Sequence, residues 1–208
     1  MMMMLSGVPS AHYAESGGRY YAEMPSNKLL YKLKESAVGK TVAVFASARR
    51  NGNTGKFIDW ISTELGINVI NLLDKDISPY DYDHNNLGDD FLSVMNYLLD
   101  YQNIIFATPI YWYGPSAQMK VFIDRTSDFL DVDELKDIGR RLRGKTGFVV
   151  CTSISSDADS SFLNSFKDTF RYLGMGYGGY IHANCEKGFN LQHYQADVDK
   201  FIQLIKSY

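Results

Sequence analysis

The chain has 208 residues, of which 45% are hydrophobic, 14% aromatic and 22% charged, a composition typical of a globular protein and unlike that of a disordered one. Its length allows one domain with a sizeable core plus an appendage, but hardly two independent enzymes. The formal net charge of −3 argues against a nucleic-acid binder, which normally carries a basic surplus.

Residues 1–40 are aperiodic and rich in Ser, Gly, Ala and Tyr. We predict that they form an arm outside a single domain at 41–208. An aperiodic segment is usually ordered only by packing on something else. We therefore expect the arm to lie along its own domain or along a partner subunit, in a homodimer or homotetramer.

From residue 41 onward, short apolar runs alternate with amphipathic segments, as in βαβ units on a parallel sheet. The runs predict strands at Thr41–Ala46, Ile67–Leu72, Asn103–Thr108, Thr146–Thr152 and Gly178–Ala183. Apolar residues at intervals of three and four predict helices around 57–65, 91–98, 119–129, 162–173 and 198–205. The stretches 77–90 and 131–145 interrupt this alternation and are predicted to be long surface connections.

This alternation predicts an α/β fold, a flavodoxin-like three-layer sandwich. Its five-stranded parallel sheet would have the order 2-1-3-4-5, with helices on both faces. In such a sheet, ligands bind at the carboxyl ends of the strands, near the point where the winding reverses. The loops after the first, third and fourth strands are therefore the candidates for a binding site.

The loop after the first predicted strand carries chemical groups that bind a phosphate. It leads into a predicted helix, whose first N–H groups have no intrahelical partner and whose dipole favours an anion. Hydroxyl, amide and guanidinium side chains add hydrogen bonds and positive charge. The predicted residues are Ser47, Arg49, Asn51, Gly52, Asn53 and Thr54. An ordinary capped turn is the structural alternative, although such turns usually take only about 2–6 residues.

Two better-known phosphate motifs do not explain this loop. The pattern GxxxxGK[ST] fails because Arg50 stands at its first glycine and Phe57 at its hydroxyl residue. A formal GxGxxG at Gly174, Gly176 and Gly179 follows a predicted helix and precedes a strand, the reverse of the dinucleotide-binding context. We interpret it as a helix end followed by a turn.

The loop after the third predicted strand places three consecutive aromatic residues between two prolines. Aromatic side chains at a ligand-binding edge are costly to leave in water without a planar partner. The predicted ring-binding residues are Pro109, Ile110, Tyr111, Trp112, Tyr113 and Gly114. Ser116 is the predicted N-cap of the next helix. The alternative is that one or two of the aromatic residues pack over the sheet edge or at a dimer contact.

These two loops resemble the NAD(P)H-dependent FMN reductase family of flavodoxin-like proteins. Ser47-x-Arg49-x-x-Gly52-Asn53-Thr54 is similar to the family's SxRxx[SG]NT loop. Thr108–Gly114, Ser116–Lys120 and Phe122–Arg125 are similar to its PIYW…S.Q.K.FIDR segment. The resemblance covers the chain from about Thr41 to the C-terminus. Residues 1–40 have no counterpart in a minimal member, and the cysteine cluster of the related iron–sulfur flavoproteins is missing.

The resemblance implies a bound FMN. Ser47, Arg49, Asn53 and Thr54 would hold its phosphate, and the segment from Pro109 to Gly114 would border the isoalloxazine ring, largely through backbone groups. Thr152 and Ser153, in the hydroxyl-rich loop after the fourth strand, would face the pyrimidine end of the ring. Ser- and Asp-rich loops also cap helices routinely, which is the structural alternative for that loop.

Other charged and titratable residues have ordinary structural explanations. The run Arg140, Arg141, Arg143 and Lys145 could bind the extra phosphate of NADPH, but such a run is more often a solvated helix end. His84 could reach the substrate pocket, although an exposed loop histidine is the simpler interpretation. No histidine has a ligand-spaced partner, so we expect no metal site.

Two cysteines, Cys151 and Cys185, are too few for a disulfide framework. We expect a reducing, cytoplasmic setting, in which these residues are free thiols rather than a redox pair. No apolar run approaches the roughly 20 residues of a membrane helix, and residues 1–25 do not form a convincing signal peptide. We therefore expect neither membrane nor nucleic-acid partners.

The function implied is that of an FMN-dependent oxidoreductase. NADPH or NADH would deliver a hydride to the flavin, and a free flavin, a quinone or an azo or nitro compound would then accept the electrons in the same place, by ping-pong kinetics. No side-chain acid or base is needed, and we nominate none. The main alternative is a flavodoxin-like electron carrier without NAD(P)H activity, which would usually be more acidic. A cofactor-free interaction domain on the same fold is a third.

Overall fold

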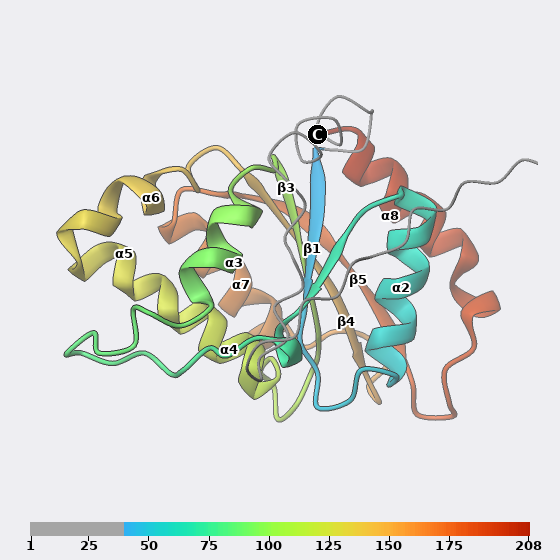
Figure 1. Cartoon of the computed structure of the whole chain (residues 1–208). Helices are drawn as coiled ribbons and strands as arrows, with labels where there is room; N and C mark the ends of the chain where they lie inside the picture. Colours follow the sequence, from blue (N-terminus) through green and yellow to red (C-terminus); the bar gives the residue numbers. More distant parts are fainter. Residues whose placement is uncertain (1–39) are drawn as a thin grey trace, which may run out of the picture.

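The computed structural model describes residues 40–208, whose five parallel strands have helices on both faces (Figure 1). The strands are β1 (Thr41–Phe45), β2 (Val69–Asn71), β3 (Asn103–Pro109), β4 (Thr146–Ser153) and β5 (Gly176–Asn184). Their order is β2-β1-β3-β4-β5, which confirms the predicted topology. The expected arm at 1–40 lies outside the described residues except for its last residue, and the domain division there stays a prediction.

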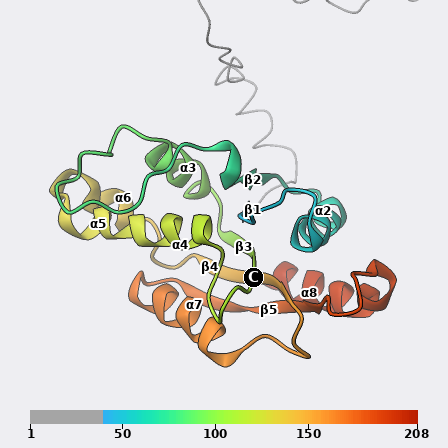
Figure 2. The same ribbon diagram turned by 90° about the horizontal axis from the view of Figure 1, so that it is seen from below.

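Helices cover the two faces of the sheet unequally. Helices α2 (Asn53–Leu65) and α8 (Gln195–Lys206) lie on one face. Helices α3 (Phe91–Leu98), α4 (Ala117–Asp124) and α7 (Ser160–Tyr172) lie on the other (Figure 2). Because side chains alternate along a strand, neighbouring strands contribute alternate residues to two cores. Ala43, Ile105 and Phe148 lie side by side toward α2 and α8.

The structure divides one predicted helix into shorter ones, and it adds helical structure to the connection at 131–145, which was predicted to be a long surface connection. The apolar stripe at 119–129 is not one helix, because α4 ends at Asp124 and is followed by η2 (Arg125–Ser127) and α5 (Asp128–Asp131). The following connection contains η3 (Asp133–Leu135) and α6 (Lys136–Arg140). Buried Leu135 and Leu142 attach this segment to the core. Two further short helices are η1 (Leu72–Asp74) and η4 (Leu191–Tyr194).

A buried ionic cluster attaches the connection at 77–90 to the end of α4. Arg125 is fully buried and forms ion pairs with Asp89 and Asp128. Its Nε donates to Asp128 Oδ2 at 2.7 Å, and Nδ1 of His84 lies 3.1 Å from Asp128 Oδ1. A buried charge is costly unless it is paired and hydrogen-bonded. This cluster therefore fixes the long connection against the helical layer.

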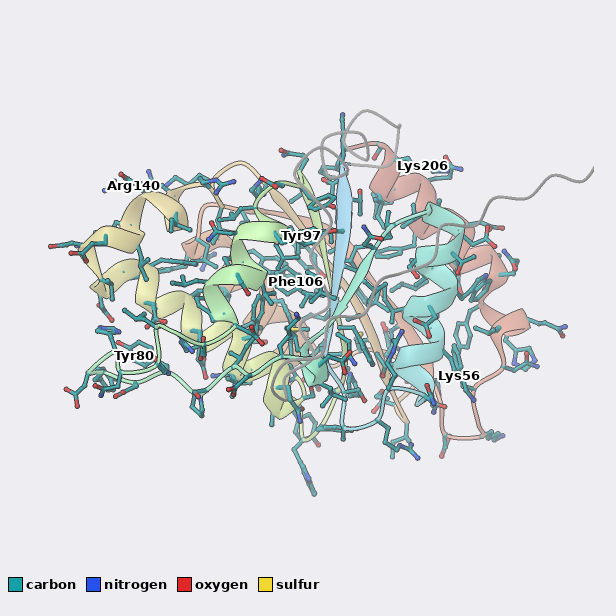
Figure 3. The ribbon with its side chains drawn as sticks, viewed as in Figure 1. Lys56, Tyr80, Tyr97, Phe106, Arg140 and Lys206 are labelled. Atoms are coloured by element: carbon teal, nitrogen blue, oxygen red, sulfur yellow. The ribbon has the colours of Figure 1, made fainter. Side chains whose placement is uncertain are left out.

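The outer part of the same connection is held by a second contact. Tyr80, labelled in Figure 3, donates its hydroxyl proton to Asp131 Oδ2 at 2.6 Å. The hydrogen bond to this carboxylate raises the pKa of Tyr80 to about 12. The connection is thus a surface segment, as predicted, with specific attachments to α5.

The formal GxGxxG segment has the predicted structural role. Gly174 follows α7 with φ of +77°, a left-handed conformation that glycine adopts at little cost. Its N–H donates to Arg171 O at 3.1 Å, and β5 begins at Gly176. In residues 40–208 no helix is long and apolar enough to span a membrane.

Candidate functional site

The carboxyl ends of β1, β3 and β4 meet at the lower edge of the sheet in Figure 1, where their loops surround a cavity of about 800 Å³. All but two of the predicted binding residues line it: Ser47, Arg49, Gly52, Asn53, Thr54, Pro109, Ile110, Tyr111, Trp112, Tyr113, Thr152 and Ser153. Sequence reasoning did not propose the other lining residues, which are Ile154, Ser155, Asp157, Asp159 and Cys185.

Asn51 and Gly114 are the two predicted binding residues that do not line the cavity. Asn51 is an exposed residue of the first loop. Gly114 instead exchanges two backbone hydrogen bonds with Tyr111, at 2.8 and 3.0 Å. Its role in the structure is to close a turn.

The first loop brings a helix N-terminus without a side-chain cap to the cavity. Gly52 is the N-cap of α2 and no side chain caps this helix, whereas Ser116 caps α4 and Asp159 caps α7. The first N–H groups of a helix have no intrahelical partner. Ser47 is buried beside this terminus, and its Oγ accepts a long hydrogen bond from the N–H of Arg49, at 3.4 Å.

Gly55 allows the first loop to pass close to α2. A Cβ at this position would lie 1.8 Å from the Arg50 carbonyl oxygen, far inside van der Waals contact. Gly55 is not among the residues lining the cavity. It was missed as a site determinant because its role is to leave space, which only the structure shows.

A buried hydroxyl pair joins the first turn of α2 to the end of β4, where the structure places Thr152 and Ser153 rather than in the loop that follows. The Oγ1 atoms of Thr54 and Thr152 are 2.6 Å apart, and both residues are almost fully buried. A hydroxyl has one proton and two lone pairs. Each of these hydroxyls therefore keeps hydrogen-bonding capacity toward the cavity after bonding to the other.

The aromatic loop forms a tight hairpin at the mouth of the cavity. Tyr111 and Gly114 pair across it, and Trp112 and Tyr113 at its tip have φ of +49° and +64°. Positive φ at two successive residues is the type I′ turn that closes two-residue hairpins, usually with Asn or Gly. Trp112 is 95% exposed and Tyr113 67%. Strained backbone of this kind is concentrated at functional sites.

The base of the hairpin is fixed by a buried hydroxyl network. Thr108 Oγ1 donates to Ser116 Oγ at 3.1 Å, and Ser116 Oγ donates to the Ala46 carbonyl at 3.1 Å. The N–H of Ser116 donates back to Thr108 Oγ1 at 3.0 Å. The aromatic loop and the end of β1 are therefore held together below the cavity, which positions the two predicted binding loops relative to each other.

The two cysteines have different environments and are both free. Cys151 is buried on β4, where burial raises the pKa of its thiol well above the usual range. Cys185 follows β5 and lines the cavity, and burial raises its pKa while a hydrogen bond with Asn53 opposes the shift. A raised pKa disfavours the reactive thiolate. Cys151 is a buried free thiol, as expected, whereas Cys185 is free but only partly buried.

Several other candidates lie away from the cavity. Arg140 pairs with Asp137 and Arg141 with Asp100, while Lys145 donates to two backbone carbonyls. These residues precede β4, so they lie near the amino edge of the sheet, opposite the cavity, as the Arg140 label in Figure 3 shows. His84 does not line the cavity and contacts Asp128 instead. In residues 40–208 no cluster of side chains could hold a metal ion.

Residues 40–190 match the family described as NADPH-dependent FMN reductase. A curated relative is the Bacillus subtilis protein YwqN, whose name describes an NAD(P)H-dependent FMN-containing oxidoreductase. It is 28% identical over 150 residues, which are 68% of this chain and 83% of YwqN.

Solved structures show the same fold. The Trp repressor binding protein from Bacillus subtilis has a TM-score of 0.63 at 23% identity, covering 80% of this chain and 98% of its own. The FMN-dependent NADH-azoreductase from Bacillus anthracis, solved in complex with FMN, has a TM-score of 0.57 at 13% identity and the same coverage. At these identities the likeness extends to the fold alone.

Proposed function

The chain belongs to the NADPH-dependent FMN reductase family, and from this premise we propose that it passes reducing equivalents from NADPH or NADH to a free flavin, a quinone or a similar small acceptor by ping-pong kinetics. The family is one of NAD(P)H-dependent oxidoreductases with FMN as cofactor. The acceptor and the kinetic order are the parts that we add.

The residues around the cavity fit FMN. A phosphate needs hydrogen-bond donors and positive charge, and the N-terminus of α2 offers uncapped N–H groups beside the Ser47 hydroxyl and Arg49. A planar ring needs flat apolar walls and a few polar groups, which the aromatic hairpin and the hydroxyls of Thr152 and Ser153 provide. The cavity of about 800 Å³ lies toward the upper end of the 300–1,000 Å³ typical of small-molecule sites.

The residues that would hold the cofactor are those of the three loops. Ser47, Arg49, Asn53 and Thr54 would bind the phosphate, and the segment from Pro109 to Tyr113 would border the ring. Thr152 and Ser153 would contact its polar end. The chemistry that bound FMN supplies is acceptance of a hydride and delivery of electrons, so the protein needs no acid or base of its own.

The observation that carries the proposal is that the three loops open into one shared cavity. A nicotinamide and an acceptor must both reach the same ring, and the exposed aromatic hairpin at the mouth offers the flat surface that each would use. Use of one place by two substrates in turn requires the first product to leave before the second substrate binds. This order supports ping-pong kinetics.

Initial-rate measurements on the FMN-loaded protein test this proposal. NADPH and NADH should each be varied at several fixed concentrations of a flavin, a quinone and an azo compound. We expect parallel double-reciprocal lines with at least one pair of substrates. Intersecting lines, or a ternary complex with both substrates bound, would contradict the shared site.

We also propose that the chain assembles as a homodimer or homotetramer. The support is the exposure of large apolar side chains at the mouth of the cavity, where Trp112 is 95% and Ile154 72% exposed. Monomeric proteins rarely leave such groups clustered in water. Light scattering coupled to gel filtration should give two or four times 23.6 kDa, and a monomer across micromolar concentrations would refute the assembly.

A further inference from the structure

A serine and a histidine on adjacent strands form a hydrogen-bonded pair in the wall of the cavity. Ser153 is the last residue of β4 and lines the cavity. His182 lies on β5 opposite Cys151, which is two residues before Ser153. Residues two apart on a strand share a face, so the two side chains meet diagonally. Nε2 of His182 is 2.8 Å from Ser153 Oγ.

The hydrogen-bonding capacity of Ser153 is nearly used up by the protein. A hydroxyl has one proton and two lone pairs, and one lone pair accepts the N–H of Ser155 at 3.0 Å. The proton and the other lone pair are left for His182 and for a ligand in the cavity. If His182 Nε2 takes the proton, Ser153 offers the ligand a lone pair. If Nε2 carries a proton, Ser153 offers the ligand its O–H.

The surroundings of His182 keep its ring neutral near pH 7. Burial lowers the pKa of His182, and the Asp157 carboxylate partly opposes this shift. The Tyr180 hydroxyl donates to both Asp157 oxygens, at 3.2 and 3.3 Å. Other titratable groups around this end of β5 are Cys151, which pairs with His182, and Asp159 and Cys185, which line the cavity.

We propose that His182 is a positioning residue that sets the hydrogen-bond polarity of Ser153 toward the bound ring. In the neutral tautomer that carries its proton on Nδ1, His182 accepts the Ser153 proton at Nε2. Ser153 then accepts a hydrogen bond from an N–H of the ligand. Protonated His182 donates to Ser153 instead, so the Ser153 O–H then faces the N–H of the ligand. Two donors that face each other cannot form a hydrogen bond. The ligand class selected is a planar ring with an imide edge. This inference rests on the proposed function, because the flavin ring carries such an imide.

Equilibrium binding tests this role without any turnover. FMN is titrated into the flavin-free protein at intervals from pH 5.0 to 8.0, and the dissociation constant is obtained from flavin fluorescence. The variant His182→Gln keeps a hydrogen-bonding group near Nε2 but does not titrate. Because the phosphate of FMN titrates in the same range, the quantity compared is the ratio of wild-type to variant dissociation constants, in which the phosphate contribution cancels.

We expect this ratio to rise about three- to tenfold as the pH is lowered from 8.0 to 5.0. Loss of one net hydrogen bond changes a dissociation constant by about this factor. The matched control is His193→Gln, since His193 is an exposed histidine that does not line the cavity. This control should follow the wild-type profile. In the Ser153→Ala background, His182→Gln should no longer change the pH profile, because His182 acts through Ser153.

Three results would overturn the inference. One is a ratio that stays flat with pH, and another is an effect of His182→Gln that persists without Ser153. The third is a ratio that falls as the pH is lowered. This result would show that the positive charge of His182, rather than the hydrogen-bond polarity of Ser153, determines FMN affinity. If His182→Gln does not fold, as judged by circular dichroism, the ratio of wild-type to Ser153→Ala dissociation constants is measured over the same pH range. A flat ratio there would likewise overturn the inference. Failure of the wild-type protein to bind FMN at any pH would overturn the proposed function as well.

Discussion

Gly55 offers a sharp test of how the first loop is positioned. In Gly55→Ala the new Cβ would lie 1.8 Å from the Arg50 carbonyl oxygen, and the loop must move until this distance exceeds about 3.0 Å. The loop that carries Arg49 and Arg50 then moves by about 1 Å relative to the N-terminus of α2, which separates the two parts of the phosphate site. Displacements of this size can cost about 100-fold in function, and overpacking typically costs about 1–3 kcal/mol of stability.

The assay for Gly55→Ala measures two quantities separately. Urea unfolding gives the free energy of unfolding, and fluorescence titration gives the dissociation constant of FMN. We expect a loss of about 1–3 kcal/mol with a fall in FMN affinity of about 100-fold. The matched control is Gly88→Ala, because a Cβ at Gly88 meets nothing within 4 Å. A folded Gly55→Ala variant that binds FMN as tightly as the wild type would refute the reasoning.

Three further predictions concern single side chains. Arg49→Ala should weaken FMN binding by about 10–30-fold. This is the lower end of the range for a charge-assisted hydrogen bond, because Arg49 is exposed. Unchanged affinity in an FMN titration would show that Arg49 does not belong to the site. Arg125→Met should lower the free energy of unfolding by about 3–5 kcal/mol, because it leaves two buried carboxylates uncompensated. The control Lys120→Met breaks an exposed ion pair and should change the free energy of unfolding by less than about 1 kcal/mol. Equal effects of the two substitutions would contradict the role of Arg125. Thr54→Val and Thr152→Val should show a coupling energy of about 1 kcal/mol in a double-mutant cycle of unfolding, whereas additive effects would show that their 2.6 Å contact contributes nothing.

The strands and their order followed from the sequence because both faces of a parallel sheet are covered. A strand in that position must be apolar along most of its length, as Val42–Phe45 and Ile104–Ala107 are. The short helices at 125–140 could not be read in the same way. Each is too short to show an apolar period, and buried Leu135 and Leu142 look like isolated residues.

The site was predictable where loop chemistry follows directly from position at the sheet edge. Ser47, Thr54 and Thr152 were found in this way, and all three line the cavity. Two features of the site could not be predicted in this way. Cys185 reaches the cavity because the edge strand β5 ends at the same edge. The turn at Trp112 gave no signal because bulky aromatic residues are not typical of positive φ.

The buried charges were the hardest feature to anticipate. Arg125 was recognised only as part of a family-like segment, and nothing in its neighbourhood along the chain distinguishes it from an exposed helix residue. Its partner Asp89 lies 36 residues earlier, in a connection that shows no apolar period. Ion pairs between distant segments leave no periodic pattern, so they are visible only after the chain has folded.

Anaerobic reduction of flavin bound to this protein tests directly whether it is an NAD(P)H-dependent FMN reductase. The protein is supplemented with FMN, desalted, and mixed with NADPH or NADH while the flavin absorbance is recorded. We expect about one retained FMN per chain and bleaching of its absorbance by at least one nicotinamide. No retained flavin would contradict the cofactor site, and retained flavin that neither nicotinamide bleaches would instead indicate an electron carrier.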